Sequence, residues 1–237
     1  WQLAVDVGTG TGQGVKVLQS YFEKIIGLDV SESQISEANR CNPFSNVEFK
    51  VSAAESLPVA DASVDLLTAC QCMHWFDIPA FLNEARRVLK LNGVLMVSRY
   101  TVPFLYTTNK ESIPIINLIY DTYRSGVLQK YFNMDRLQYF DSGYAQVEFP
   151  FSDVSRRKPF MDEVVTGESC IDEVKSWSVF QSLLQKEPSV AATVLANLRK
   201  NIISYFGEND LSKLYVDKLM PRSGVQGVTK LRASALH

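Results

Sequence analysis

A run of glycines and small polar residues near the start of the chain has the composition of a ligand cradle. Residues 5–14 read VDVGTGTGQG, with glycines at positions 8, 10, 12 and 14. Glycine allows sharp backbone turns and leaves no Cβ in the way of a ligand that lies against the main chain. A helix expected directly after the run would present free N–H groups to a polar ligand. The segment therefore predicts a site of the nucleotide-binding type.

The spacing of these glycines indicates which kind of nucleotide would fit. The dinucleotide fingerprint is G-x-G-x-x-G, and its last glycine would have to stand at position 13 or 15. Those positions hold Gln13 and Val15, so the fingerprint fails in both registers. The spacing G-x-G-x-G after an acidic strand residue, Asp6, instead suits a ligand that has no pyrophosphate.

An acidic residue at the end of the second expected strand is the next candidate. Asp29 lies 17 residues after Gly12, where a carboxylate can accept hydrogen bonds from both ribose hydroxyls of an adenosine. An Asp has the same task in dinucleotide enzymes, so Asp29 alone does not separate the two classes. Asp29 is alternatively a helix N-cap, although Ser31, with Gln34 three residues later, already has the pattern of a capping box.

Strand and helix signals alternate over the first hundred residues and place these groups at one edge of a sheet. We expect strands at residues 3–7, 24–30, 47–52, 64–70 and 94–100, and helices at residues 14–22, 31–40 and 78–90. This alternation predicts an α/β fold with a doubly wound, mostly parallel sheet covered on both faces. Ligands of such sheets bind beyond the carboxyl ends of the strands. The loops expected there are residues 8–14, 29–31, 52–56 and 71–77.

The pattern changes after Tyr100. We expect a helical stretch at about residues 112–128, a short strand at 147–149, helices over 160–207 and two candidate short strands near the end. Either residues 213–220 or residues 225–232 would supply an antiparallel seventh strand. The many aromatic residues between positions 104 and 144 either line a pocket for a second substrate or pack as ordinary core.

Length and composition narrow the class of protein. At about 150 residues per domain, 237 residues predict one domain with a large insertion or cap. The 46% of hydrophobic and 21% of charged residues are typical of globular proteins and disfavour disorder, collagen and coiled coil. With 24 basic against 26 acidic residues and a net charge of −2, no broad basic field favours nucleic acid as a partner.

Cysteine content and hydropathy indicate a compartment. Four cysteines are too few for a disulfide scaffold and favour a reducing environment. No apolar run approaches the roughly 18 residues that span a bilayer, and no signal peptide is evident. We therefore expect a cytoplasmic protein, either a monomer or a homodimer, with no membrane span.

Five segments together resemble the core of a class I S-adenosylmethionine-dependent methyltransferase. They are VDVGTGTG at residues 5–12, GLDVS at 27–31, AESLP at 54–58, VDLLT at 64–68 and LKLNGVL at 89–95. Within that superfamily, HWFD at 74–77 and SWS at 176–178 resemble the trans-aconitate methyltransferase-like group, which has a methyltransferase type 11 domain. The resemblance implies a Rossmann-like, seven-stranded sheet with a helical insertion.

The resemblance also implies a division of the chain. Residues 1–237 would form a single methyltransferase domain with a cofactor-binding core at 1–102. Helical insertions at 103–145 and 152–210 would form a cap on the acceptor side. Because the chain enters a strand almost at once after Trp1, we expect that the N-terminal helix common in this fold is missing from its start.

The same resemblance implies roles for residues toward S-adenosylmethionine, whose product is S-adenosylhomocysteine. The amino-acid part of the cofactor would be held by Asp6, Gly8, Thr9, Gly10, Thr11 and Gly12. Asp29 would bind the ribose, and Val30 would pack on the adenine.

Two later loops would complete the cofactor site. Ala54 and Glu55 would line the adenine edge. Many class I enzymes have an Asp just before that Ala, where this chain has Ala53, so adenine recognition would fall to Glu55 or to the backbone. The sulfonium would be closed over by Gln71, Cys72 and Trp75.

The candidates for catalysis and for binding the methyl acceptor lie outside the glycine run. His74 is either a general base or substrate hydrogen-bonding group, or a structural histidine that donates to a carbonyl. Trp75 and Trp177 could form an aromatic wall that favours a cation, although Trp177 is alternatively ordinary helix packing. Arg99 and Arg124 are the basic residues best placed to hold an acidic substrate, and Arg124 is alternatively a solvated surface residue.

Other reactive residue types have simpler interpretations. Cys70 and Cys72 are expected to be small buried hydrophobes. The basic run at residues 156–158 is expected to be a solvated loop. No cluster of Cys, His and carboxylate residues has the spacing of metal ligands, so we expect no metal site.

Three functional hypotheses follow. The first is a methyltransferase that acts on the carboxylate or hydroxyl oxygen of a small molecule. The second is the same chemistry on a lipid or quinone-like ring or on a protein. Nucleic-acid bases are disfavoured, because residues 71–74 read QCMH where many base-modifying enzymes have an Asn/Asp-Pro-Pro-Tyr signature. The third is a non-catalytic cofactor-binding protein of the same fold.

Overall fold

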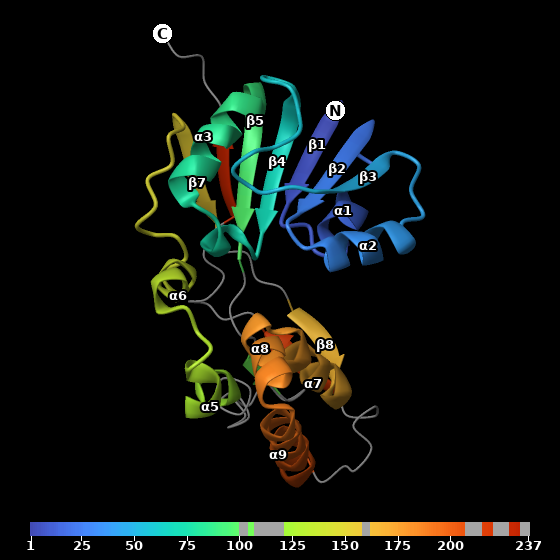
Figure 1. The fold of residues 1–237 in the computed structure, drawn as a ribbon, viewed down its shortest axis with the longest axis vertical. Coiled ribbons are helices and arrows are strands. Elements are labelled where there is room, and N and C mark those ends of the chain that lie inside the picture. The colour runs from blue at the N-terminus through green and yellow to red at the C-terminus, as the bar shows by residue number, and fades with distance from the viewer. Residues whose placement is uncertain (100–103, 107–120, 158–161, 207–214, 220–227, 233–237) are drawn as a thin grey trace. The chain divides into compact units, whose positions relative to one another are not determined.

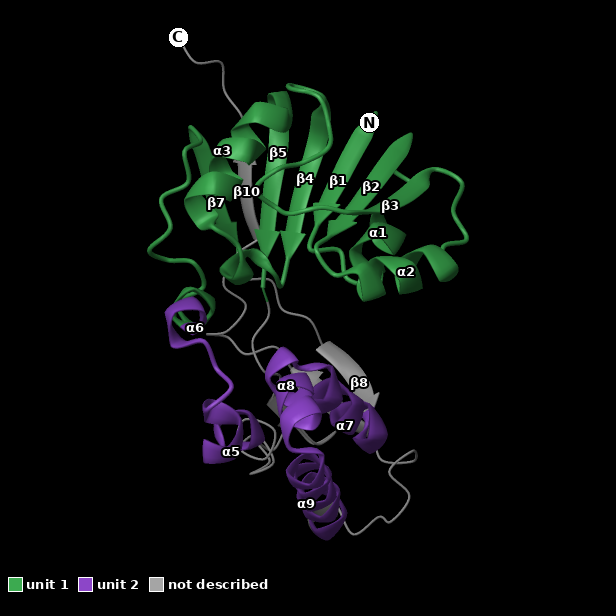
Figure 2. Ribbon diagram, viewed as in Figure 1, with its two compact units in different colours: residues 1–99, 138–158, 226–237 green, residues 100–137, 159–225 purple. Residues whose placement is uncertain are grey.

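The computed structural model describes residues 1–99, 104–106, 121–157, 162–206, 215–219 and 228–232. These residues form two compact units (Figure 2). Unit 1 comprises residues 1–99, 138–158 and 226–237, and unit 2 comprises residues 100–137 and 159–225. Each unit has its own core and is described by itself.

A mostly parallel sheet is the centre of unit 1 (Figure 1). Its parallel strands are β1 (Leu3–Val7), β2 (Lys24–Asp29), β3 (Val47–Val51), β4 (Val64–Cys70) and β5 (Leu89–Ser98). Two further strands, β10 (Val228–Arg232) and β7 (Asp153–Arg157), run antiparallel to their neighbours. The strand order is β3-β2-β1-β4-β5-β10-β7.

Helices cover both faces of this sheet. They are α1 (Gln13–Leu18), α2 (Glu32–Arg40), η1 (Met73–Trp75) and α3 (Ile78–Val88). Alternate residues of β1 belong to different cores: Val5 and Val7 pack with α3, whereas Ala4 packs with Val15 of α1. The strands β2 and β3 lie on one side of β1, and β4 and β5 lie on the other. Right-handed crossovers therefore place α1 and α2 on one face of the sheet and α3 on the opposite face. The doubly wound α/β fold expected from the sequence is thus confirmed.

Side-chain caps explain where two of these helices begin. The Ser31 hydroxyl accepts from the Gln34 backbone N–H at 3.4 Å, and the Asp77 carboxylate accepts from that of Ala80 at 3.1 Å. Each cap satisfies an N–H group that the first turn of a helix leaves unpaired. Both helix starts were expected from the sequence and are confirmed.

Unit 2 contains a small helical core and a second sheet. Its strands are β6 (Phe104–Tyr106), β8 (Asp162–Thr166) and β9 (Tyr215–Leu219), in the order β6-β9-β8. The described helices include α5 (Gly126–Gln129), α7 (Gly167–Ser176), α8 (Ser178–Lys186) and α9 (Pro188–Phe206), and α6 (Met134–Asp141) spans the boundary between the units. Apolar residues such as Ile171, Phe180 and Leu183 form the core. No helix among the described residues is long and apolar enough to span a membrane.

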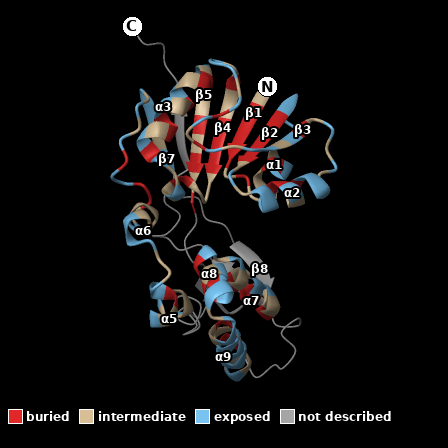
Figure 3. Ribbon diagram, in the orientation of Figure 1, coloured by how far each residue is buried: buried red, intermediate tan, exposed pale blue. Residues whose placement is uncertain are grey.

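The two cores differ in how they are built (Figure 3). Buried residues follow one another along most of β1 and β2 in the parallel sheet, where both faces are covered. In α8 and α9, buried residues alternate with exposed ones, as expected for helices with one apolar face.

Several expectations for the second half of the chain were wrong. Residues 147–149 are not a strand: Val147 is buried, but its N–H donates to the Tyr144 carbonyl within a turn. The strand instead lies at β7, which includes part of the basic run expected to be a solvated loop. Arg156 donates to the carbonyls of Tyr144 and Val147 at 3.3 and 3.4 Å, so the run holds the turn in place.

The boundaries of the insertions also differ from those expected. Residues 138–158 belong to unit 1, although 138–145 and 152–158 were assigned to the insertions. The expected helix at 112–128 lies outside the described residues as far as position 120, and its described end is interrupted at Ser125, which caps α5. The strand β8 was not expected. Of the two candidate C-terminal strands, the one within 225–232 lies antiparallel to β5, and the other is β9 of the second sheet.

Candidate functional site

The glycine loop joins the end of β1 to the start of α1. Gly8, Gly10 and Gly12 all have positive φ, at 67°, 57° and 86°, a conformation that residues with a Cβ adopt at a cost. The loop is also held from within, because the Gly12 N–H donates to the Thr9 carbonyl at 3.0 Å. The glycines are therefore required by the turn itself.

Two of these glycines make room for protein and one leaves open space. A Cβ on Gly8 would lie 2.7 Å from Cβ and Sγ of Cys72, and one on Gly12 would lie 2.6 Å from the Phe49 ring. A Cβ on Gly10 would meet only the Gln34 side chain, at 3.8 Å. Gly10 is thus the position where a ligand has room to approach the loop.

Asp6 is the buried anchor of this loop. Its side chain is 3% exposed, and its two oxygens accept from the hydroxyls of Thr9 at 2.8 Å and Thr68 at 2.5 Å. Burial raises the pKa of Asp6 above its ordinary value, against the effect of the hydrogen bonds from Thr68 and Thr9. Direct contact between Asp6 and a ligand stays a prediction.

Asp29 connects the glycine loop to the end of β2. Its Oδ2 accepts from the Gly10 N–H at 3.0 Å, and its Oδ1 accepts from the Ser31 N–H at 2.9 Å. A carboxylate has about four acceptor positions, so both oxygens keep capacity for further donors such as hydroxyl groups. The side chain is half-buried and joins two of the predicted loops. Ser31, not Asp29, is the N-cap of α2.

The loops after β3 and β4 meet the same edge. Glu55 accepts the Asp77 N–H at 2.8 Å and so ties the loop after β3 to the N-terminus of α3. Cys72 donates its thiol to the Val7 carbonyl at 3.1 Å, and burial raises the pKa of that thiol well above its ordinary value. Gln71 has a positive φ of 58° and donates its N–H to the Ser98 carbonyl at 2.8 Å.

The remaining cofactor candidates differ in exposure. Val30 is 69% exposed and Ala54 is 3% exposed. An exposed valine beside Asp29 leaves an apolar surface uncovered, as the predicted adenine contact requires. Thr11 is half-buried beside Gly12. The structure therefore brings all the predicted cofactor residues to the carboxyl edge of β1 to β4, while their ligand contacts stay predictions.

His74 and Trp75 lie in η1, directly after β4. The His74 ring contacts two aromatic rings, with its centroid 5.1 Å from that of Trp75 and 5.0 Å from that of Phe140. Its Nδ1 is 3.1 Å from the hydroxyl of Tyr144. Trp75 is 45% exposed, so one aromatic face at this edge is accessible to a substrate.

The candidates for the acceptor side belong to different units: Trp75 and Arg99 to unit 1, and Arg124 and Trp177 to unit 2. Arg99 is 3% exposed, lies 5.0 Å from the Phe140 ring centroid and donates to the Asp141 carbonyl at 3.3 Å. Its surroundings favour a structural role. Trp177 is in unit 2, at the junction of α7 and α8, and packs edge-on against Tyr123 at 5.2 Å. Arg124 lies 6.0 Å from the Tyr123 ring.

Sequence reasoning missed three residues that shape the site. Thr68, the partner of Asp6, is a buried polar residue in a mostly apolar strand, which is a usable signal. Phe49 fills the space over Gly12 and Gly27, and a glycine inside a strand indicates such a close approach. Tyr144, the partner of His74, lies 70 residues away in the chain and has no local signal.

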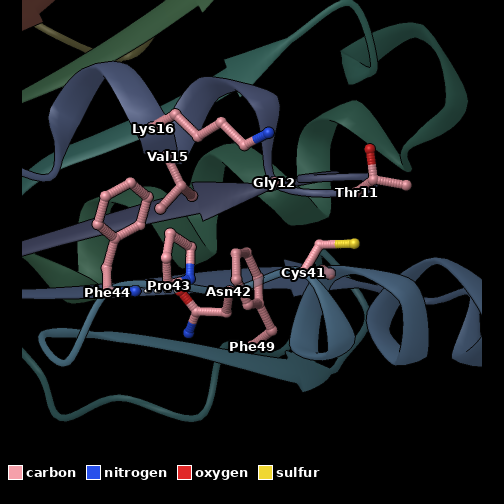
Figure 4. Close-up of a pocket in the computed structure, with 10 residues that line it drawn as sticks. Thr11, Gly12, Val15, Lys16, Cys41, Asn42, Pro43, Phe44 and Phe49 are labelled. Carbon is pink, nitrogen blue, oxygen red and sulfur yellow. Dashed lines mark hydrogen bonds between the residues drawn. The ribbon is translucent and has the colours of Figure 1, made fainter.

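A small hollow lies beside the glycine loop (Figure 4). It is lined by Thr11, Gly12, Val15, Lys16, Ala38, Cys41, Asn42, Pro43, Phe44 and Phe49. It shares only Thr11 and Gly12 with the predicted cofactor residues, and neither Asp29 nor His74 lines it. We interpret it as the packing seam between α1, the end of α2 and β3. Among the described residues, no group of three or more His, Cys, Asp or Glu side chains could hold a metal ion.

Known proteins with similar sequences are methyltransferases. Residues 5–97 match the model of a methyltransferase domain. The chain is 28% identical over 219 residues to a protein of Dictyostelium discoideum named as a methyltransferase, covering 92% of this chain and 79% of that protein. It is 33% identical over 101 residues to the demethylmenaquinone methyltransferase of Tropheryma whipplei, which is 42% of each chain.

A solved structure with a similar fold is also described as a methyltransferase. A type II methyltransferase from Anaeromyxobacter dehalogenans superposes with a TM-score of 0.73 at 24% identity, covering 99% of this chain and 91% of that one. The narrower likeness to the trans-aconitate methyltransferase-like group stays a prediction. The domain match over residues 5–97, the similar protein that covers 92% of this chain and the sheet topology agree, and together they support a class I S-adenosylmethionine-dependent methyltransferase.

Proposed function

We propose that the chain binds S-adenosylmethionine at the glycine loop and transfers its methyl group to an oxygen of a small molecule. One observation carries the proposal: Asp29 accepts hydrogen bonds from Gly10 and Ser31 with one oxygen each. This places an anionic acceptor beside the one glycine of the loop that has open space at its Cβ position. The arrangement fits an adenosine that has ribose hydroxyls and no pyrophosphate.

The residues of the site would have separate tasks. Asp29 would accept the ribose hydroxyls, and the exposed Val30 would cover the adenine. Asp6 would hold Thr9 and thereby the loop. When bound, the cofactor supplies a methyl carbon already activated by a positively charged sulfur. The protein then mainly has to align the acceptor and exclude water, which contributes up to ~7–11 kcal/mol in favourable cases.

The acceptor is proposed to be a carboxylate or hydroxyl oxygen of a small molecule in the cytoplasm. The near-neutral net charge of −2 supports a small acceptor over a nucleic acid. The exposed Trp75 and the half-buried His74 supply an apolar face and a polar group at the same edge. Because one relative is a demethylmenaquinone methyltransferase, a quinone-like ring is the alternative acceptor.

Calorimetry and a product screen test this proposal. We expect titration with S-adenosylmethionine to show one site, and titration with NAD to show none. A screen with methyl-labelled cofactor against carboxylic acids, phenols, quinols and amines would then identify the acceptor. Tight NAD binding without binding of S-adenosylmethionine would overturn the proposal, and binding without turnover in every class would favour a non-catalytic protein.

A further inference from the structure

A tyrosine from a distant part of unit 1 reaches the candidate catalytic histidine. The Tyr144 hydroxyl lies 3.1 Å from Nδ1 of His74. Tyr144 is only 2% exposed, so its hydroxyl has to find its hydrogen-bond partners within the protein. His74 precedes α3, whereas Tyr144 follows α6. The contact therefore links the loop after β4 to a segment that no motif associates with the site.

The backbone around Tyr144 is held firmly. Tyr144 has a φ of 57°, and the preceding Gly143 has a φ of 65°. Its N–H donates to the Tyr139 carbonyl at 2.9 Å, and its carbonyl accepts from Val147 at 3.1 Å and from the Arg156 guanidinium at 3.3 Å. A left-handed conformation at a bulky residue is uncommon and persists only where surrounding contacts fix it. The hydroxyl is thus presented to His74 from a rigid turn.

The direction of the Tyr144–His74 hydrogen bond follows from where the hydroxyl proton can go. Burial raises the pKa of Tyr144 well above its ordinary value, so the hydroxyl keeps its proton near neutral pH. A hydrogen bond from the His74 backbone to the phenol oxygen acts on the pKa in the opposite direction, and it occupies one acceptor position of that oxygen. Among the described residues, Nδ1 of His74 lies within hydrogen-bonding distance of the hydroxyl and can accept its proton.

We infer that Tyr144 is a positioning residue that donates its hydroxyl proton to Nδ1 of His74 and so holds the imidazole in the tautomer that carries its proton on Nε2. The opposite tautomer would point an N–H at the hydroxyl and would take this acceptor away from the buried hydroxyl proton. A buried donor left without an acceptor destabilises the protein. The partner of one ring nitrogen thus decides the chemistry of the other.

This tautomer decides what His74 can do for a substrate. With Nε2 protonated, His74 offers a hydrogen-bond donor and is not a general base. If the proposed methyl transfer holds, His74 then favours an acceptor that is already an oxyanion. A carboxylate attacks with its own lone pair, the bond between methyl carbon and sulfur breaks, and its electron pair stays on the sulfur, so no proton has to leave. A hydroxyl or amine acceptor loses a proton and needs a base. The inference thus narrows the proposed acceptor to a carboxylate.

Nitrogen NMR of the histidine ring tests the inference without cofactor or substrate. The chain has two histidines, His74 and His237, so the variant His237→Gln leaves a single ring to assign. We would record long-range proton–nitrogen correlations on the ¹⁵N-histidine-labelled full chain at about pH 8.5, above the ordinary imidazole pKa of about 6.5. We expect Nε2 to carry the proton and Nδ1 to have the shift of a bare nitrogen.

Two tyrosine variants in the same background complete the test. Tyr144→Phe removes only the hydroxyl, and we expect His74 to become a mixture of both neutral tautomers. Tyr139→Phe removes the same atom from a half-buried tyrosine of the same segment, and we expect no change. A wild-type ring protonated at Nδ1, or an unchanged tautomer in Tyr144→Phe, would overturn the inference. If Tyr144→Phe does not fold, the wild-type tautomer alone decides.

The outcome is independent of the proposed function. The ring tautomer is read in the protein alone, whereas binding of S-adenosylmethionine is read by calorimetry. Failure to bind the cofactor with Nε2 protonated would refute the proposed function and leave the role of Tyr144 intact. Cofactor binding with Nδ1 protonated would do the reverse, and it would return His74 to the role of a base.

Discussion

Gly8 of unit 1 and Gly126 of unit 2 have opposite surroundings. In unit 1, Gly8 has a φ of 67°, and a Cβ there would lie 2.7 Å from two atoms of Cys72. In unit 2, Gly126 at the start of α5 has no heavy atom within 4 Å of its Cβ position. The first glycine is required by backbone geometry and by a neighbour, and the second by neither. The sheet unit is thus specified position by position, whereas the helical unit depends mainly on the apolar faces of its helices.

The largest effect that could break this comparison is expected at Gly8. Gly8→Ala forces a positive φ on a residue with a Cβ and pushes it against Cys72. Strain and overpacking together should lower the free energy of unfolding by roughly 2–5 kcal/mol, and affinity for S-adenosylmethionine should fall at least about 100-fold. Denaturant unfolding and calorimetry measure the two quantities.

A matched glycine and a double variant sharpen this test. Gly126→Ala should leave both quantities unchanged within error, because its Cβ meets open space. Cys72→Gly in the Gly8→Ala background removes the two contact atoms and should restore part of the stability. If Gly8→Ala bound the cofactor within threefold of wild type, the loop would be more adaptable than its geometry indicates.

Unit 2 supplies the next effect, in its core. Leu183 of α8 is fully buried, and Leu183→Ala should cost about 3 kcal/mol through lost burial and the cavity left behind. Affinity for S-adenosylmethionine should stay within twofold, because the predicted cofactor residues all belong to unit 1. The chain has three tryptophans, of which Trp177 belongs to unit 2. In a Trp177→Phe background, the remaining tryptophans at positions 1 and 75 report on the unfolding of unit 1. A large loss of affinity in Leu183→Ala would contradict the separation of tasks.

How far the sequence predicted each unit follows from the same difference. In unit 1, the glycine spacing, the Ser31 cap and the apolar strands are local signals. They predicted β1 to β4, the later part of β5 and the residues at the carboxyl edge. Val147 shows where local signals end. It is buried, but its place in a turn depends on Tyr144 and on Arg156 from β7. Neither of these contacts produces a periodic pattern of apolar residues in the sequence.

Unit 2 was predicted less well for a related reason. An amphipathic helix packs against whichever apolar face is available, so its pattern indicates a helix without indicating a partner. The helices over 160–207 were therefore expected, but β8 was not, because its partner β9 lies about fifty residues later. Trp177 was expected on a helix face and instead separates α7 from α8.

A medium effect is expected at Asp29. In Asp29→Asn, one oxygen still accepts, but the new amide N–H₂ faces the N–H of Gly10 or of Ser31. An unsatisfied backbone donor and the lost charge should weaken binding of S-adenosylmethionine about 10- to 100-fold. Asp172→Asn removes an exposed carboxylate of unit 2 that pairs with Lys175, and it should leave calorimetric affinity unchanged. Equal affinities of the two variants would remove Asp29 from the site.

The smallest effect is a pH dependence at the far end of β1. Burial alone would raise the pKa of Asp65, but hydrogen bonds from the Leu3 backbone, from Lys90 and from the Gln2 backbone lower it below its ordinary value. A carboxyl with a lowered folded-state pKa stabilises the fold above its unfolded pKa of about 4. That contribution is lost as the pH falls through the folded-state value. Asp65→Asn should cost about 1 kcal/mol at pH 7, and the difference from wild type should shrink below pH 4.

Glu187 of unit 2 is the matched carboxylate for this last test. Hydrogen bonds from Lys130 and Tyr131 lower the pKa of Glu187 as well, but its side chain is 35% exposed against 15% for Asp65. Solvent screens an exposed pair, and such pairs contribute little to stability. Glu187→Gln should therefore have the same unfolding midpoint as the wild type at each pH from 7 to 3, in urea titrations followed by circular dichroism. Two carboxylates with similar partners would then differ because one joins strands of a buried sheet and the other lies at the exposed junction of α8 and α9. An equal pH dependence in both would show that burial is not what separates the units.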